Sequence, residues 1–283
     1  THFILTEKLD GVSCLIYFDR KNKNINLYTK GDSLYGTNIS YIKHIIFNND
    51  IKSKLNNILK SQQFTQIIAI RGELIIKKQI FSVENKICKI QNKKLYKDTR
   101  SMIVGLINNK KISQDKLRLK KNIDFIAYEL IKSTHKQLTK QEQLNFFIHH
   151  KFNIPKFKLI EKNYLTEINI NNDYYSFKNN SEYDIDGIIL EHNIDYVRDN
   201  KKNPNYLKAF KIQDNTYESI ITNIKWKLGK YNKLTPVIIF NPVQINNRII
   251  TKASGHNIKF LMDKSIYINS HINILLSGDI IPY

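Results

Sequence analysis

The sequence predicts an α+β fold with antiparallel sheets and flanking helices, followed by a small all-β barrel. Strand-like runs of β-branched and aromatic residues alternate with helical patterns over the first part of the chain. After about residue 214, short β-like segments follow one another at close intervals, as they do in a small barrel. We therefore expect two domains, 1–213 and 214–283.

The expected strands of the first domain are the apolar runs that contain many β-branched and aromatic residues. They cover 11–18, 25–31, 64–76, 122–131, 183–193 and 205–213. Helical spacing of apolar residues predicts one or two helices over 41–59 and helical structure over 85–112 with a tightly packed Gly105. An amphipathic helix is expected over 140–152, where Asn-Ile-Pro ends it. The polar segment 170–182 is expected to be a surface loop.

The barrel prediction depends on four short segments that have the composition of strands. They are 217–228, 234–243, 248–254 and 272–281. No internal repeat of about 20–50 residues accompanies them, so a repeat architecture is not indicated.

Composition indicates a folded protein. Hydrophobic residues make up 41% of the 283 residues and charged residues 25%. No run of about 18 apolar residues is present, so no membrane span is expected, and the start lacks the apolar region of a signal peptide. Cys14 and Cys88 show no metal-binding spacing. We expect an intracellular protein, in the cytoplasm, the nucleus or a viral replication site.

The net charge is +20, which favours a polyanionic partner through neutralisation of phosphates. Only six of the 45 basic residues are arginine, and the chain contains many Asn, Ile, Lys and Tyr residues. Codon bias in an A+T-rich genome would produce the same composition. The charge therefore supports a nucleic-acid partner without establishing one.

The segment Lys8-Leu9-Asp10-Gly11 lies next to a predicted strand. Alone, this pattern often arises by chance, as an exposed lysine before an aspartate in a turn. A lysine that attacks phosphorus needs neighbouring cations that lower its pKa and hold phosphate, a carboxylate for a metal ion, and a platform for the base. The chain offers candidates in this order: Lys8, Asp10, Arg71, Glu73, Tyr128, Asp186 and Lys211.

Each candidate also has a purely structural explanation. Arg71 and Glu73 could form an ion pair at a strand end, Tyr128 could be a core aromatic residue, and Lys211 could be a solvated lysine. The order in which they occur along the chain favours chemistry over these explanations.

This order resembles the covalent nucleotidyltransferase superfamily, which attaches a nucleoside monophosphate to the lysine of Lys-x-Asp-Gly. Further segments resemble the NAD-dependent DNA ligases within that superfamily. They are YTKGDSLYGTNIS (28–40), IRGELII (70–76), TRSMIVGLI (99–107), DFIAYEL (124–130), YDIDGIIL (183–190), YLKAFKI (206–212), KLGKYNKLTPVIIFNPVQI (227–245), KASGHN (252–257) and SGDIIP (277–282). The resemblance covers nearly the whole chain.

The resemblance implies a nucleotidyltransferase (ATP-grasp-like ligase) adenylation domain followed by an OB-fold barrel. Lys8 would be the adenylated nucleophile, and Asp10 would orient it or contact ribose and metal. Glu73 would hold the ribose and is the second candidate metal ligand. Tyr128 would stack on adenine, and Lys211 would bind the α-phosphate and lower the pKa of Lys8. Further nucleotide contacts are expected from Lys30, Arg71, Arg100 and Asp186, and DNA contacts from Lys227, Lys230 and Lys233.

Four positions depart from the family pattern. Lys30 and Asn108 stand where the family has arginine, and Ser33 stands where it has glycine. Glu191 falls where the family has a lysine that contacts the adenylate phosphate, and a carboxylate there would repel phosphate. Three explanations stay open: a nearby lysine such as Lys208 substitutes, the strand register is shifted, or the protein is weakened or inactive.

The function implied is that of an NAD-dependent DNA ligase core. It would form lysyl-AMP from NAD and, with Mg²⁺, seal 5′-phosphate/3′-hydroxyl nicks in duplex DNA. We expect a monomer whose partner is nicked double-stranded DNA, without a membrane. The alternatives are a catalytically degenerate relative that binds nucleic acid or protein, and an ATP-dependent RNA or DNA ligase.

The family also carries an N-terminal segment that binds the nicotinamide mononucleotide half of NAD, and further modules after the OB fold. We find no counterpart of these in the sequence. We therefore expect a piece of a longer protein or a reduced relative.

Overall fold

The computed structural model describes residues 2–282 except 20, 23, 32–35, 48–49, 61–66, 110–113, 133–137, 197–203, 212–215, 229–233, 246–247 and 278–280. The chain forms two compact units, Thr1–Phe210 and Lys211–Tyr283. Within the described ranges, no helix has both the length and the apolar character that crossing a membrane requires.

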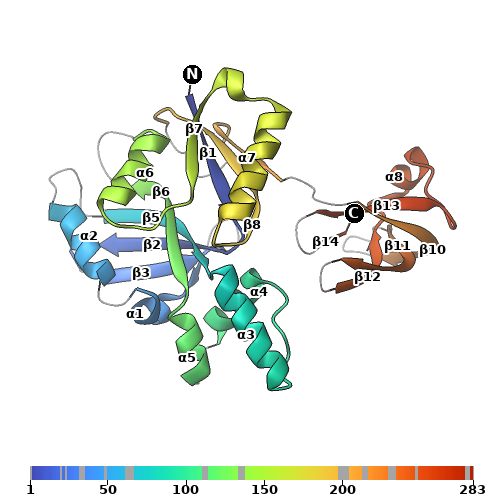
Figure 1. The fold of residues 1–283 in the computed structure, drawn as a ribbon, viewed down its shortest axis with the longest axis horizontal. Coiled ribbons are helices and arrows are strands. Elements are labelled where there is room, and N and C mark those ends of the chain that lie inside the picture. Colours follow the sequence, from blue (N-terminus) through green and yellow to red (C-terminus); the bar gives the residue numbers. More distant parts are fainter. Residues whose placement is uncertain are drawn as a thin grey trace. The chain divides into compact units, whose positions relative to one another are not determined.

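The first unit contains a five-stranded antiparallel sheet (Figure 1). Its strand order is β4 (Thr37–Asn38), β3 (Asn24–Thr29), β2 (Val12–Asp19), β5 (Ile67–Ile75) and β6 (Asp124–Lys132). Alternate residues of β2, among them Ile16 and Phe18, point into the core, as the period of a strand requires. Along β5, Arg71 and Glu73 interrupt a run of buried residues. These two residues lie on one face of the sheet, because they are two positions apart.

A second antiparallel sheet of four strands completes the first unit. Its order is β7 (Phe157–Glu161), β1 (His2–Leu9), β8 (Ile185–His192) and β9 (Leu207–Phe210). The chain passes from β1 to β2 through Asp10-Gly11, so this dipeptide joins the two sheets. A Cβ atom on Gly11 would lie 2.3 Å from the carbonyl oxygen of Leu74, so only glycine fits this crossing.

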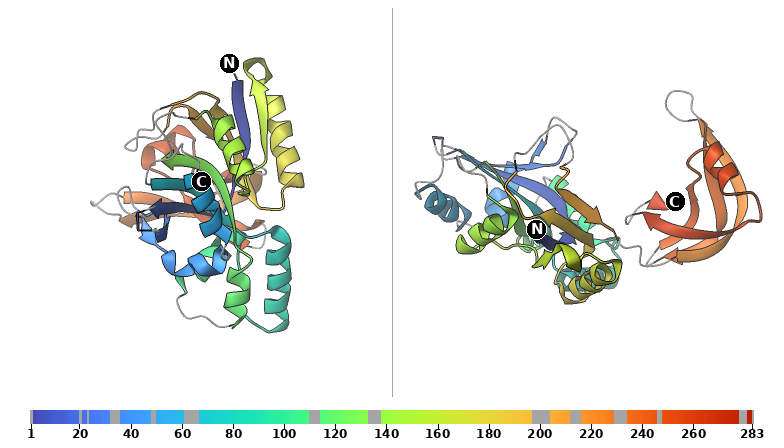
Figure 2. Two further views of the ribbon diagram at one scale, coloured as in Figure 1. Left: turned by 90° about the vertical axis from the view of Figure 1, so that its left-hand side faces the viewer. Right: turned by 90° about the horizontal axis from the view of Figure 1, so that it is seen from above.

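Helices surround these sheets (Figure 2). They are η1 (Ser40–Ile42), α1 (Lys43–Ile46), α2 (Asp50–Lys60), α3 (Lys78–Ile90), α4 (Thr99–Asn108), α5 (Gln114–Lys120), α6 (Lys140–His149), η2 (Lys162–Tyr164) and α7 (Glu167–Asn180). Helix α4 packs on β2 and β5, α6 on β6, and α7 on β1 and β8. Capping boxes at Asp98 and Thr139 fix where α4 and α6 begin.

Three local predictions were wrong. The segment 170–182 is not a loop, because it lies largely within α7, whose N-cap is Thr166 and whose buried residue is Tyr174. Its polar composition reflects a helix that buries little. The expected helical segment 85–112 is divided between α3 and α4, and Asn92 between them has a φ of 51°. Gly105 is not tightly packed, since a Cβ atom there would meet nothing within 4 Å.

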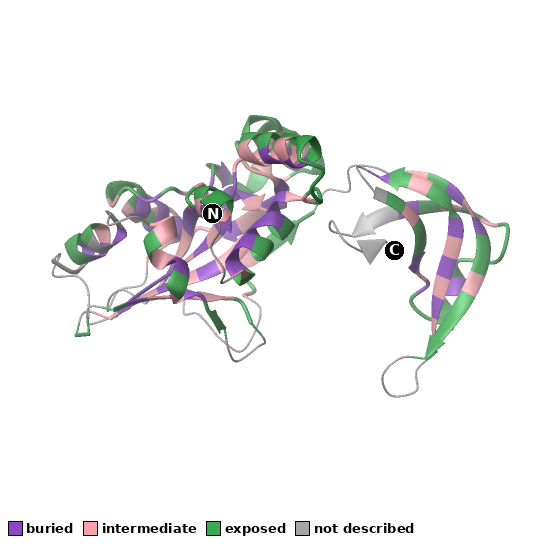
Figure 3. Cartoon of the chain, turned by 90° about the horizontal axis from the view of Figure 1, so that it is seen from below, coloured by how far each residue is buried: buried purple, intermediate pink, exposed green. Residues whose placement is uncertain are grey.

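The second unit is a five-stranded antiparallel sheet. Its elements in chain order are β10 (Thr216–Leu228), β11 (Leu234–Ile245), β12 (Arg248–Ser254), α8 (Ile258–Asp263), β13 (His271–Ser277) and β14 (Ile281–Pro282). The strand order is β12-β11-β10-β13-β14, and β12 also lies against β14, so the sheet curls on itself. Buried residues such as Ile221, Phe240 and Ile274 alternate with more exposed ones along the strands (Figure 3). Helix α8, capped by Asn257, was not predicted.

Candidate active site

Lys8 lies near the end of β1, opposite Gly187 of β8. Its Nζ is 2.5 Å from Oδ1 of Asp186, with side-chain exposures of 26% and 13%. The lysine is therefore partly buried and paired. The sequence separation of 178 residues between the two is bridged by the pairing of β1 with β8.

Asp10 and Arg100 form the next contact. Arg100 donates from Nη1 to Oδ1 of Asp10 at 3.3 Å, and the carboxylate is almost completely buried. Arg100 is in the first turn of α4, where Thr99 donates from its hydroxyl to Oδ2 of Asp184 at 2.9 Å. This bond ties the start of α4 to the residue before β8, and so brings Arg100 to Asp10.

Glu73 on β5 is a buried carboxyl group on which several charged groups of the site act. Burial raises its pKa to about 7, against the opposing effects of Arg100, Lys8 and a hydrogen bond from Tyr128, while Asp186 raises it further. A Cβ atom on Gly11 would lie 2.8 Å from Cγ of Glu73, so this side chain borders the Lys-x-Asp-Gly segment. The structure thus brings six of the predicted residues into one cluster. They are Lys8, Asp10, Glu73, Arg100, Tyr128 and Asp186.

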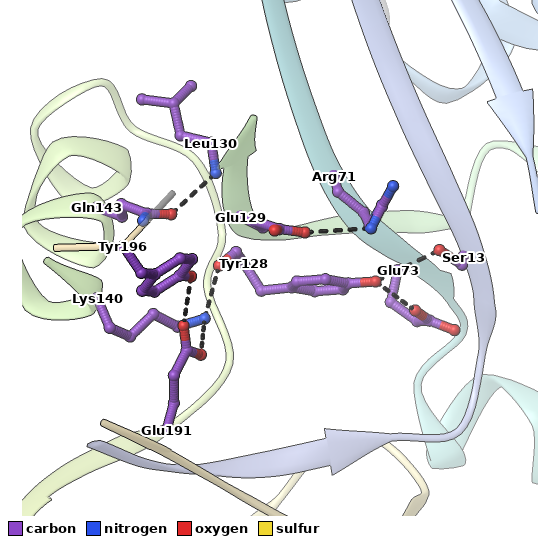
Figure 4. A network of polar contacts seen from close by, with 10 residues as sticks. All are labelled: Ser13, Arg71, Glu73, Tyr128, Glu129, Leu130, Lys140, Gln143, Glu191 and Tyr196. Carbon is purple, nitrogen blue, oxygen red and sulfur yellow. Dashed lines mark hydrogen bonds and ion pairs between the residues drawn. The ribbon is translucent and has the colours of Figure 1, made fainter. Parts of the chain in front are cut away.

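Tyr128 on β6 reaches this cluster with its hydroxyl group (Figure 4). The hydroxyl donates to Oε2 of Glu73 at 3.5 Å and lies 3.4 Å from Oγ of Ser13. Burial, and next the charge of Glu73, raise the pKa of Tyr128, so the phenol stays neutral. Arg71 lies beside it and pairs from Nη1 with Oε2 of Glu129 at 3.3 Å.

The remaining predicted residues are described by their place along the chain. Lys30 directly follows β3 and is exposed. Lys211 directly follows β9, is exposed, and is the first residue of the second unit, so its role stays a prediction. Lys227 is exposed on β10. Lys230, Lys233 and Ser33 lie outside the described residues.

Glu191 is the departure with the largest structural consequence. Its carboxylate is buried, with Oε2 2.6 Å from Nζ of Lys140, and its Oε1 accepts from the hydroxyl of Tyr196 at 2.7 Å. Lys208, the candidate compensating residue, is exposed and lies opposite Leu190. The cation beside Glu191 is therefore Lys140.

Asn108 is the last residue of α4 and is exposed. Eight residues separate it from Arg100 on the same helix, which corresponds to a rise of about 12 Å. The position therefore lies at the opposite end of the helix from the contact between Arg100 and Asp10.

Sequence reasoning missed four residues that contact predicted ones. Ser13, Glu129, Lys140 and Tyr196 contact Tyr128, Arg71 or Glu191. The register pairs Ser13 with Glu73, so knowledge of the strand pairing would have identified Ser13. Lys140 gave no sequence signal, because its partner Glu191 lies on a distant element of the chain. Tyr196 is only five positions from Glu191, but no motif marks it.

Within the described part of the chain, no group of three or more His, Cys, Asp or Glu residues could hold a metal ion by itself. Mg²⁺ is usually held by one or two carboxylates together with phosphate oxygens and water. Asp10 and Glu73 both interact with Arg100. These two carboxylates fit a Mg²⁺ ion whose other ligands are phosphate oxygens and water.

Comparison with known families gives two matches in chain order. Residues 1–213 match the family model described as the NAD-dependent DNA ligase adenylation domain. Residues 218–283 match the one described as the NAD-dependent DNA ligase OB-fold domain. The two matches together cover nearly all of the chain.

Individual relatives agree with these matches. A DNA ligase of Acanthamoeba polyphaga mimivirus is 33% identical, over 99% of this chain and 40% of the relative. A DNA ligase of Mycoplasmopsis synoviae (strain 53) is 28% identical, over 99% of this chain and 43% of the relative. The chain thus spans about two fifths of these relatives' length. A solved structure named "Pmar-Lig_Pre." has a TM-score of 0.56 at 10% identity, over 99% of this chain and 61% of its own, a likeness of fold.

Proposed function

The chain belongs to the NAD-dependent DNA ligase family, and we propose that it is a catalytic core that seals nicks in duplex DNA with AMP taken from NAD. The observation that carries this proposal is the cluster around Lys8. The lysine of Lys-x-Asp-Gly lies against Asp186, and Glu73 interacts with it, with Arg100 and with Tyr128. Such a set suits covalent nucleotidyl transfer better than a structural ion pair, because positioning and charge neutralisation dominate that chemistry.

We also propose that the adenylation domain is 1–213 and the OB-fold domain 214–283. The family matches, 1–213 and 218–283, support this division. The compact units also support it, since the chain divides into them after Phe210, close to the proposed boundary.

In the first step, Lys8 must lose a proton before it attacks. Asp186 is placed to accept that proton, with Oδ1 2.5 Å from Nζ. The lysine nitrogen then bonds to the adenylyl phosphorus of NAD, and the bond from that phosphorus to the nicotinamide mononucleotide phosphate breaks. Arg100 offsets the negative charge, while Tyr128 supports the adenine and Glu73 binds the ribose.

Two transfers follow. An oxygen of the 5′-phosphate at the nick attacks the adenylyl phosphorus, the phosphorus–nitrogen bond breaks, and the amine of Lys8 regains a proton. The 3′-hydroxyl then attacks the 5′-phosphorus, loses its proton, and AMP departs. When bound, Mg²⁺ neutralises phosphate charge; Asp10 and Glu73 would hold it together with phosphate oxygens. Lys211 would contact the α-phosphate, and Lys30 and Arg71 would complete nucleotide binding.

The duplex would be bound by the second domain. Lys227 is exposed on β10, opposite Thr235 of β11. We propose that Lys227, Lys230 and Lys233 contact the DNA backbone there, which contributes a salt-dependent share of the affinity.

The test uses NAD or ATP labelled in the adenylyl group, incubated with the protein and Mg²⁺. We expect protein-bound label from NAD alone, and none in Lys8→Ala, because the phosphorus–nitrogen bond requires that amine. Lys89→Ala, which removes an exposed lysine of α3, should still take up label. If the protein takes label from ATP, the adenylyl donor is ATP and not NAD. Absence of label from both donors, in the full-length gene product as well and with nicked DNA still bound, would favour a degenerate binding protein.

A further inference from the structure

Strand β6 is irregular at Tyr128. The flanking pairs are Arg71 with Glu129 and Gly72 with Ala127, so Tyr128 is an extra residue without a partner on β5. Such a bulge disrupts the ladder locally and re-aims the side chain of the extra residue. The backbone of Tyr128 therefore needs hydrogen bonds from elsewhere.

Helix α6 supplies one such hydrogen bond, to the carbonyl of Tyr128, and a second one to the backbone of Leu130. Lys140, in its first turn, donates from Nζ to the carbonyl oxygen of Tyr128 at 3.0 Å. One turn later, Oε1 of Gln143 accepts from the backbone N–H of Leu130 at 3.0 Å. Both side chains are nearly inaccessible to solvent. Two polar residues of one helix face thus bind β6 on either side of Glu129.

A buried ammonium group needs a counter-charge, because desolvation without one is costly. Glu191 on β8 provides it at 2.6 Å, with side-chain exposures of 6% for Lys140 and 2% for Glu191. Tyr196 donates to the same carboxylate and stacks on Tyr206, with ring centroids 3.4 Å apart. Burial, and next the charge of Glu191, raise the pKa of Tyr196, so it remains a donor.

The network connects both sheets of the first unit (Figure 4). Tyr128 is held at its carbonyl by Lys140 and at its hydroxyl by Glu73. Glu191 lies on β8, the strand that also carries Asp186 and pairs with the strand of Lys8. The ring of Tyr128 is therefore fixed relative to the lysine through β8.

We propose that Lys140, Glu191 and Tyr196 are positioning residues that fix Tyr128 for binding of the adenine nucleotide. Lys140 acts through the carbonyl of Tyr128, and Glu191 and Tyr196 hold Lys140 in place. The inference rests on the proposed function. It also explains how Glu191 is accommodated, since its charge is balanced by Lys140 within the protein.

A positioning role and a merely structural role differ in kinetics. If the ring of Tyr128 is misplaced, nucleotide binding is weakened in the ground state and in the transition state alike. KM then rises while kcat is unchanged. Partial unfolding instead lowers the active fraction, which lowers the apparent kcat and leaves KM unchanged. Initial rates of lysyl-AMP formation over a range of NAD concentrations separate the two.

The main variant is Lys140→Met/Glu191→Gln, which removes both charges so that none is left buried alone. The amide at position 191 can still accept from Tyr196. We expect KM for NAD and Kd for AMP to rise about tenfold, as loss of one charge-assisted hydrogen bond implies, with kcat unchanged. Lys140→Arg, which keeps the charge and the donor, should restore part of the affinity.

The matched control is Lys158→Met/Asp173→Asn. It removes another lysine–carboxylate pair, at 2.9 Å between β7 and α7, and should leave KM unchanged. If Lys140→Met/Glu191→Gln does not fold, Tyr196→Phe, which deletes only one hydroxyl group, should raise KM in the same direction. Unchanged KM in the folded variants, or an equal rise in the control, overturns the inference alone. A wild-type protein that neither takes label from NAD nor binds AMP overturns the proposed function and the inference together.

Discussion

At the residue scale, the buried carboxyl group of Glu73 shows how the site differs from an ordinary core. Its pKa is raised from 4.5 to about 7, chiefly by burial. The folded protein therefore carries a carboxylate that it desolvates, next to Lys8, Arg100 and Asp186. A group that destabilises the fold at neutral pH is typical of a site kept for function.

The ionisation of Glu73 makes the stability of the protein depend on pH. Because the folded state holds the proton of Glu73 more tightly than the unfolded state does, this group contributes fully to the free energy of unfolding below pH 4.5. That contribution is lost as the pH rises through about 7. We expect Glu73→Gln to stabilise the protein at pH 8 by at most about 3 kcal/mol and to change little at pH 4. Urea denaturation at pH 4 and at pH 8 measures the change in the free energy of unfolding.

The control is Glu161→Gln, because that side chain is 67% exposed and should change stability little at either pH. Glu73→Gln should lower nucleotide affinity at the same time. An equal gain in stability at pH 4 and pH 8 would contradict the assignment of the effect to ionisation of Glu73.

At the element scale, two glycines differ in whether the fold requires a residue without a side chain. Gly72 lies between the site residues Arg71 and Glu73, and a Cβ atom there would lie 2.4 Å from the carbonyl oxygen of Ile126. The same atom would lie 2.5 Å from the ring of Phe125. Gly105 lies within α4 and has open space around it.

The same substitution should therefore have opposite effects at these positions. Gly72→Ala should destabilise the protein by at least about 1–3 kcal/mol, because backbone atoms must move to make room. Gly105→Ala should stabilise it by about 0.5–1 kcal/mol, because glycine is unfavourable inside a helix. Denaturant midpoints measure both, and a loss of stability in Gly105→Ala would contradict the open space found there.

At the scale of the whole molecule, the net charge of +20 gives every duplex contact a general electrostatic background. Individual phosphate contacts add to this background and can be counted from the salt dependence of binding. Exposed lysines occur in both units, so charge alone does not identify the duplex-binding surface.

Lys227→Ala tests the second unit directly. We expect weaker binding of nicked duplex DNA at low salt, and a slope of log affinity against log salt that is smaller by about 1. Lys89→Ala, which removes an exposed lysine of α3, should leave the slope unchanged. Equal effects of the two substitutions would mean that the net charge, and not this strand, determines binding.

The sequence by itself determined the α+β class and most of the strands, but not β1, β4 or β7. It also predicted the candidate site residues Lys8, Asp10, Glu73, Arg100, Tyr128 and Asp186. These follow from local signals, such as period-two alternation and short motifs, that do not depend on distant partners. It failed for α7, where few apolar residues mark the buried face.

Only the tertiary structure decided which of these residues meet and how they are charged. Lys8 and Asp186 are 178 positions apart, and the partners Lys140 and Glu191 lie on separate elements. Strand register, the bulge at Tyr128 and the burial of Glu73 arise from packing two sheets together. Burial and long-range pairing depend on the whole fold, so no local pattern contains them.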